Sequence, residues 1–221
     1  MRSHPVLSQP SIDLSRLVPI VLHMDAGPFT KKGKSAMVVN FSSVLADGSD
    51  KETVFCIATW IKDKHTKTDA NHEPFWSWLR ESFNRLSCRT WGDKNLDGTM
   101  FQEESWRGSN SNKQLEWGAV HIGNKMDLEA YVSEQGWNGY NSNQPCGLCR
   151  CNRSDRPWTD FRDAAAWRAT IMSAAEYSAR YSHCHPLQRF PGSTAMTNFL
   201  DAMHVMDYQG VTSRVAGWSN G

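Results

Sequence analysis

The chain has 221 residues, a length that suits one sizeable domain or one domain with a small insertion. Its apolar content of 39% and charged content of 21% are those of a folded globular protein and exclude a disordered one. The formal net charge of +1 gives no bias toward an acidic or basic partner, so any nucleic-acid surface must be a local patch.

Three apolar, β-branched runs near the N-terminus predict three strands joined by short turns. They follow an extended N-terminal segment, residues 1–16, which contains two prolines. Consecutive strands with short turns form an antiparallel meander. The predicted strands are residues 17–25, 36–45 and 53–61.

A helix, a strand and a second helix are predicted next, with a polar loop after the first helix. The second helix begins after Asp127, which suits an N-cap, and stops at Gly136. The predicted ranges are 74–91 for the first helix, 93–113 for the loop, 115–123 for the strand and 127–136 for the second helix.

A cysteine loop and two further helices complete the chain, one over residues 159–182 and one from residue 194 almost to the end. The order β-β-β-α-β-α is the opening order of an RNase H-like domain. The predicted fold is therefore α/β, with an RNase H-like mixed sheet, a cysteine loop and C-terminal helices. The predicted parts are an extended segment 1–16, a core 17–143, a knuckle loop 144–158 and a C-terminal helical part 159–221.

Two acids follow predicted strands that would be neighbours in such a sheet. Asp25 ends the first strand and Asp127 follows the fourth. Carboxylates clustered at strand ends can hold a pair of Mg²⁺ or Mn²⁺ ions for phosphodiester chemistry. The alternative is a purely structural pair, with Asp127 as a helix cap and Asp25 as a turn residue, because acids after strands are common.

The cysteine loop carries the stronger signal. Cys146 and Cys149 have the C-x-x-C spacing that lets two thiolates grip one tetrahedral Zn²⁺. A second pair of ligands can come from His183, Cys184 and His185. The alternatives are partly buried free thiols, or a redox pair, which normally sits at a helix start after a strand.

Further polar residues can bind ions or phosphate. Asp201 and His204 lie three residues apart on a predicted helix, where they can bind metal or form an ordinary hydrogen-bonded pair. Basic residues in two loops can contact nucleic acid or simply face solvent: Lys31, Lys32, Lys34, Arg150 and Arg153.

The order of these pieces resembles the catalytic region of DDE-type transposases, and most closely CACTA-like elements and related multicopy, uncharacterised protist proteins. The resemblance covers roughly residues 17–217. It is carried by three stretches in order: "VLHMDAGPF", "GNKMDLEAYVSEQGW" with the following "QPCGLC", and "NFLDAMHVMDYQG".

The resemblance implies that Asp25 and Asp127 are the first two catalytic acids and that Asp201 and His204 form the Asp-x-x-His motif. Cys146 and Cys149 would form a knuckle with structural zinc, and DNA would be the partner. Ala26 departs from the pattern, which often has an acid or glycine there. No acid follows Asp207, where the third catalytic acid is expected, so the chain is predicted to be partial and inactive.

Two other functions stay open from the sequence. One is a zinc-knuckle module that binds nucleic acid or protein without catalysis, and the other is a gene fragment without function. No apolar run is long enough to cross a membrane, and the first residues lack the apolar core of a secretory signal. The prediction is an intracellular location, the nucleus included, with the DNA target and oligomeric state unspecified.

Overall fold

A computed structural model describes residues 4–8, 12–28, 35–61, 73–95, 97–139, 141–181 and 186–200. Several residues singled out in the sequence lie outside these ranges, and their predicted roles stay predictions. They are Lys31, Lys32, Lys34, His183, Cys184, His185, Asp201, His204 and Asp207.

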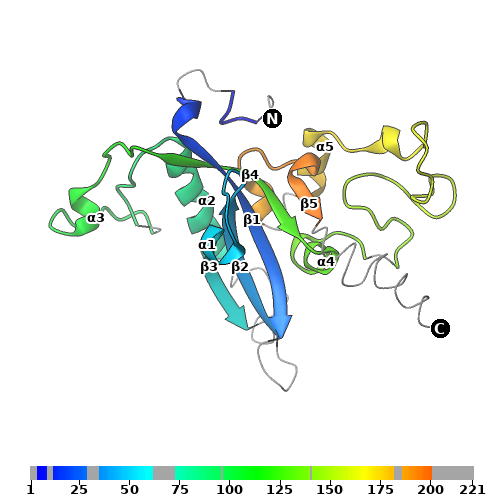
Figure 1. The fold of residues 1–221 in the computed structure, drawn as a ribbon, viewed down its shortest axis with the longest axis horizontal. Coiled ribbons are helices and arrows are strands. Elements are labelled where there is room, and N and C mark those ends of the chain that lie inside the picture. Colours follow the sequence, from blue (N-terminus) through cyan, green and yellow to red (C-terminus); the bar gives the residue numbers. More distant parts are fainter. Residues whose placement is uncertain are drawn as a thin grey trace.

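Five strands form one mixed sheet in the order β3-β2-β1-β4-β5 (Figure 1). The first three strands pair antiparallel with their neighbours, which confirms the predicted meander. The last two strands run parallel to β1. The strands are β1 (Leu17–Pro28), β2 (Ser35–Ser43), β3 (Val54–Ile61), β4 (Gly118–Met126) and β5 (Asn198–Leu200).

Helices lie between the parallel strands, and two of them, beginning at Glu73 and Leu128, match helices that the sequence predicts. In the part of the chain that the structure describes, two α-helices lie between β3 and β4, and two between β4 and β5. The described helices are α1 (Asp50–Thr53), α2 (Glu73–Ser87), α3 (Trp106–Ser109), α4 (Leu128–Gln135) and α5 (Ala174–Tyr181).

The prediction of one long helix over residues 159–182 is wrong. Its described residues, 159–181, contain only a short 3₁₀ turn at Arg168–Thr170 and then α5. The Asp160 carboxylate accepts hydrogen bonds from the backbone and side chain of Arg162, and Trp167 donates its indole N–H to the Asp160 carbonyl. Side-chain bonds of this kind compete with helical backbone pairing, which explains the turn-rich path. Residues 198–200, predicted within a helix, form β5 instead.

The main core lies between the sheet and α2. Trp76, Leu79 and Phe83 recur at helical spacing on α2, and all three are buried. They pack with buried sheet residues such as Leu22 and Met37. Complete burial of an apolar side chain of this size stabilises the fold by about 1.5–3 kcal/mol. Residues from α4, α5 and the segment before β5 extend the same core: Tyr131, Tyr177, Tyr181, Leu187, Phe190 and Ala195.

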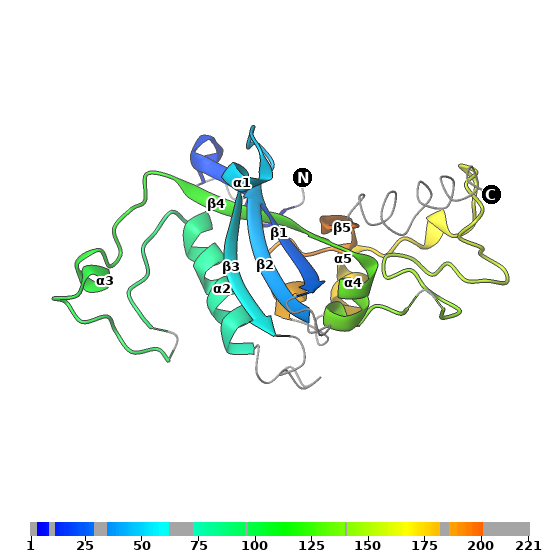
Figure 2. The same cartoon turned by 60° about the horizontal axis from the view of Figure 1, so that its bottom comes forward.

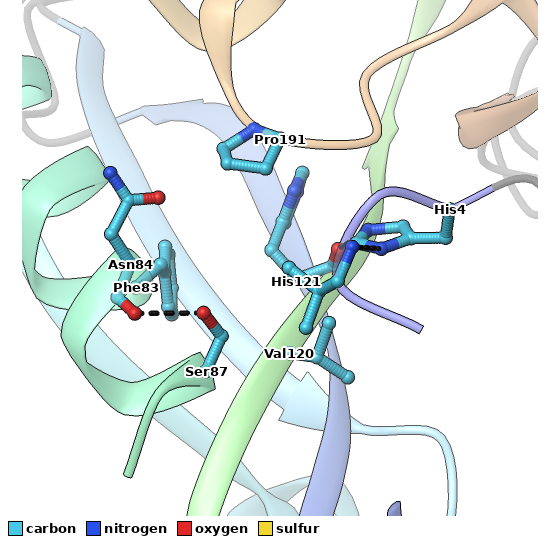
Figure 3. A pocket seen from close by; sticks show the side chains of 8 residues that line it. His4, Phe83, Asn84, Ser87, Val120, His121 and Pro191 are labelled. Atoms are coloured by element: carbon cyan, nitrogen blue, oxygen red, sulfur yellow. Dashed lines mark hydrogen bonds between the residues drawn. The ribbon is translucent and has the colours of Figure 1, made fainter. Parts of the chain in front are cut away.

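Two histidines fasten the N-terminal segment to β4. The His4 ring nitrogen Nε2 lies 2.9 Å from the His121 carbonyl oxygen, and both side chains are buried (Figure 3). The His121 ring packs against Phe83 and Phe190, and its Nε2 lies 3.0 Å from Asn124 Oδ1. Two neutral, buried imidazoles therefore hold the N-terminal segment against β4.

Both ends of α4 follow the predicted capping. The Asp127 carboxylate accepts a hydrogen bond of 2.5 Å from the backbone N–H of Ala130. Gly136 has a φ of 71°, a left-handed conformation that glycine adopts without strain. These caps set where the chain leaves β4 and where it turns toward the cysteine loop.

Across the described part of the chain, no helix combines the length and apolarity that crossing a membrane requires.

Candidate metal centre

The cysteine loop is anchored to the core by its glycine and leucine. Gly147 lies so close to the indole of Trp137 that a side chain at this position would clash with the ring. Trp137 in turn stacks on Tyr131, with ring centroids 4.2 Å apart. The Leu148 carbonyl accepts a hydrogen bond of 3.0 Å from the N–H of Met172. The loop therefore has a defined position next to the domain.

Three cysteine side chains converge in this loop. The sulfurs of Cys146, Cys149 and Cys151 all lie within 4.8 Å of one another. Cys149 and Cys151 are buried, Cys146 is half-buried, and all three are free thiols. Zinc–sulfur bonds of about 2.3 Å in a tetrahedral site place ligand sulfurs about 3.8 Å apart. The three thiols can therefore become ligands of one zinc ion with small movements.

The local electrostatics favour such an ion. The Cys146 thiol hydrogen-bonds Cys149, which raises the pKa of Cys146, together with burial, and lowers the pKa of Cys149. Burial also raises the pKa of Cys151. A second and third thiolate would crowd negative charge in a buried place, and a bound cation removes that cost.

Backbone N–H groups support the sulfurs from the protein side. The N–H of Leu148 donates to the Cys146 sulfur at 3.3 Å. The N–H of Cys151 also hydrogen-bonds the Cys149 sulfur, which favours the thiolate. Such amides partly balance the charge of thiolates bound to a metal. The donor set thus fits a soft, thiolate-preferring ion such as zinc.

The arginines predicted to contact nucleic acid are exposed on this loop. Arg150 pairs with Glu176 at 3.4 Å, and its backbone N–H donates to the Thr170 hydroxyl. The Arg153 guanidinium lies over the Trp158 ring, 5.8 Å from its centroid. Both side chains therefore flank the cysteine cluster at the protein surface.

The two predicted catalytic acids lie on neighbouring strands. β1 and β4 are parallel, and Met24 is the register partner of Met126. Asp25 and Asp127 each come one residue later and so occupy adjacent positions. The prediction that the first strand ends at Asp25 is wrong: β1 continues to Pro28 and pairs Asp25 with Val38 of β2, so only Asp127 follows a strand end. Asp25 and Asp127 are both half-buried. One carboxylate oxygen of Asp127 already caps α4 through Ala130.

This donor set does not fit a pair of Mg²⁺ or Mn²⁺ ions. Two-metal centres need enough carboxylates to hold both ions, and Mg²⁺ gives up its water reluctantly. Among residues that the structure describes, no third His, Cys, Asp or Glu forms a close group with Asp25 and Asp127. The predicted acids are neighbours, but the described residues supply only part of a catalytic site.

Cys151 is the functional candidate that the sequence reasoning missed as a ligand. Its signal was present, since a third cysteine follows Cys149 after a single residue. The predicted partners His183, Cys184 and His185 are outside the described ranges, so the fourth ligand stays a prediction.

Comparisons of the chain with protein-family models, with curated proteins and with solved structures find no match. The function must therefore be inferred from the geometry of the sheet and of the cysteine loop.

Proposed function

We propose that the chain carries an RNase H-like domain related to DDE-type transposases, with a structural zinc ion in its cysteine loop. The antiparallel meander of β1, β2 and β3, followed by a helix and the parallel strand β4, supports the fold assignment. The three convergent thiols support the zinc ion. The domain positions DNA or an assembly partner and does not cut DNA with its described residues alone.

The observation that carries this proposal is the register of β1 and β4. It sets Asp25, within β1, beside Asp127, directly after β4. The resemblance expects two catalytic acids on these two strands. Two neighbouring carboxylates can hold a single hard divalent cation, although weakly. A chance pair of turn acids would not need to fall on adjacent parallel strands at the same register position.

The test is local paramagnetic broadening by Mn²⁺ in NMR spectra of the full chain. We expect the amide signals near Asp25 and Asp127 to broaden first, and each of Asp25→Asn and Asp127→Asn to abolish that effect. Asp47→Asn, an exposed acid before α1, is the matched control and should change nothing. Broadening that is absent near both acids, or unaffected by either substitution, would overturn the assignment of these acids.

A second candidate function is nucleic-acid binding by the cysteine loop without catalysis. The exposed Arg150, and Arg153 with Trp158 beneath it, favour this function because Arg contacts phosphates and aromatic rings stack on bases. Fluorescence anisotropy with labelled single-stranded and duplex DNA tests it. Arg153→Ala should weaken binding several-fold, whereas Lys51→Ala, which removes the same charge from α1, should not.

A further inference from the structure

A recess opens at the protein surface where the chain leaves the cysteine loop. It is lined by Arg153, Pro157, Trp158 and Thr159 and has a volume of about 160 Å³. The cavity drawn in Figure 3, measured in the same way, holds about 10 Å³. One bound water needs about 10–15 Å³, so that cavity has room for a single water at most. The recess beside Trp158 has room for a group the size of an aromatic ring.

A buried asparagine shapes the turn that carries the recess. The side-chain oxygen of Asn152 accepts hydrogen bonds of 2.9, 3.0 and 3.3 Å from the backbone N–H groups of Ser154, Asp155 and Arg156. The backbone N–H of Asn152 donates in turn to the Arg156 carbonyl at 2.9 Å. Asn152 itself is buried. The turn between the cysteine cluster and Trp158 is therefore fixed by its own hydrogen bonds, and the recess is formed before any ligand binds.

The arginine at the rim of the recess has no acidic partner in the described part of the chain. The other two arginines of the cysteine loop each pair with a carboxylate, Arg150 with Glu176 and Arg156 with Asp155. The Arg153 guanidinium is exposed, lies 5.8 Å from the centroid of the Trp158 ring and donates one hydrogen bond to the Asn141 carbonyl at 3.3 Å. A guanidinium has five N–H donors, so most of them stay available to a ligand.

An aromatic wall beside a cation without an acidic partner matches the chemistry of a nucleotide. Trp158 is half-buried and lines the recess with its exposed part. Aromatic side chains stack on nucleobases, and arginine binds phosphate through charge-assisted hydrogen bonds. In a duplex the faces of the bases are covered by stacking, and only the base edges are open in the grooves. The recess can therefore take a base only from a single strand.

We propose that this recess binds one unpaired nucleotide of a single-stranded nucleic acid, with the base stacked on Trp158 and the phosphate on Arg153. The inference rests on the proposed binding of nucleic acid by the cysteine loop, and it specifies that ligand as a single strand. DNA and RNA share this chemistry, because the contacts are to base and phosphate. Every base has a π-face, so the site should bind different sequences with similar affinity.

The test is fluorescence anisotropy of the full, zinc-loaded chain with labelled oligo(dT), labelled oligo(U) and a labelled DNA duplex of equal length. Trp158→Leu removes the aromatic face and keeps an apolar side chain, whereas Trp158→Phe restores a ring. The matched control is Trp106→Leu, which removes an exposed tryptophan from α3, at the opposite end of the molecule from the cysteine loop (Figures 1 and 2).

We expect Trp158→Leu to weaken the binding of both single strands about tenfold, within the range for losing one base–aromatic stack. Trp158→Phe and Trp106→Leu should weaken it less than about threefold. Arg153→Ala should lower the slope of log K against log salt by about 0.7, the value for one phosphate contact in a single strand. The duplex should bind more weakly than oligo(dT), and Trp158→Leu should not change its affinity.

A second measurement needs no substitution at the recess. The parent chain is photo-crosslinked to a strand that carries 5-iodouracil, and the linked residue is mapped by mass spectrometry. The crosslink should fall on Trp158, and a crosslink confined to other residues would overturn the proposal. This result decides the matter if Trp158→Leu loses zinc or changes the circular dichroism spectrum.

Failure of this proposal is distinguishable from failure of nucleic-acid binding by the cysteine loop. If Trp158→Leu binds single strands as the parent does, while Arg153→Ala weakens single strands and duplex alike, the loop contacts phosphates only. The recess proposal then fails and nucleic-acid binding stands. If no nucleic acid binds the parent chain, both fail.

Discussion

Met24 of β1 and Met126 of β4 are register partners on neighbouring parallel strands, and both are completely buried. The residues that follow them, Asp25 within β1 and Asp127 directly after β4, therefore lie side by side where β4 ends. A one-residue slip of either strand would move a methionine out of the core and an aspartate into it. The hydrophobic pattern that fixes the register thus also places the acids side by side.

The zinc site makes the first prediction. The purified chain should contain about one zinc per molecule, and Cys151→Ser should lose it as fully as Cys146→Ser or Cys149→Ser. Loss of the ion should lower the melting temperature by about 5–10 °C, because binding free energy contributes to folding free energy. Metal content and thermal unfolding are the measurements.

The control for that experiment is Cys88→Ser, which replaces an exposed free thiol outside the loop. It should keep both zinc and stability. Metal-free parent protein with unchanged unfolding on chelation would show the three cysteines to be bystanders.

The second prediction separates the two roles of Asp127. Asp127→Ala removes the cap of α4 and should destabilise the protein by about 1 kcal/mol, a typical value for losing an N-cap. Asp127→Asn keeps a capping oxygen and should cost much less, although it removes the charge needed for Mn²⁺. Urea unfolding of both variants checks this, and equal destabilisation would show that capping is not the structural role.

Much of the sheet was predictable, because its strands carry local signals. Local sequence alone predicts the strands β1, β2 and β3, from their β-branched runs. It also predicts both ends of α4, from the caps Asp127 and Gly136. β5 was not predictable, since Asn198–Leu200 is only three residues long and owes its conformation to pairing with β4. A strand of that length has no alternation pattern of its own.

The cysteine loop shows a similar division. The C-x-x-C spacing indicated a metal pair, but the third thiol joins it only because the chain folds back after Cys149. The long helix expected after the loop does not form, because the Asp160 carboxylate accepts a hydrogen bond from Arg162 and the Met172 N–H donates to the Leu148 carbonyl. These contacts depend on the folded loop, which local propensity does not contain.

The third prediction concerns DNA cleavage. At the position of Asp25 and Asp127 the described residues supply two carboxylates, and that of Asp127 caps a helix. At most one Mg²⁺ should therefore bind there, and only weakly. We expect no strand cleavage or joining of labelled duplex DNA by the 221-residue chain with Mg²⁺ or Mn²⁺. Cleavage that disappears in both Asp25→Ala and Asp127→Ala would contradict this and would require a third ligand from elsewhere in the chain.

The last prediction is a loss of stability in mild acid. Burial lowers the pKa of His121 to about 4 from its ordinary value of 6.5, and burial also lowers the pKa of His4. Protonation would place a charge on the His121 ring between Phe83 and Phe190, where its Nδ1 has no hydrogen-bond partner among the described residues.

The sign follows from where each state binds protons. Above about pH 6.5 both states keep these imidazoles neutral, and the stability is fully present. As the pH falls from 6.5 toward 4, the unfolded state binds protons that the folded state does not bind. The free energy of unfolding therefore decreases, by roughly 3 kcal/mol for His121. Urea unfolding at pH 7.5 and pH 5 should show this slope. His121→Gln, which cannot titrate, should flatten it, and an unchanged slope in that variant would assign the acid sensitivity to other groups.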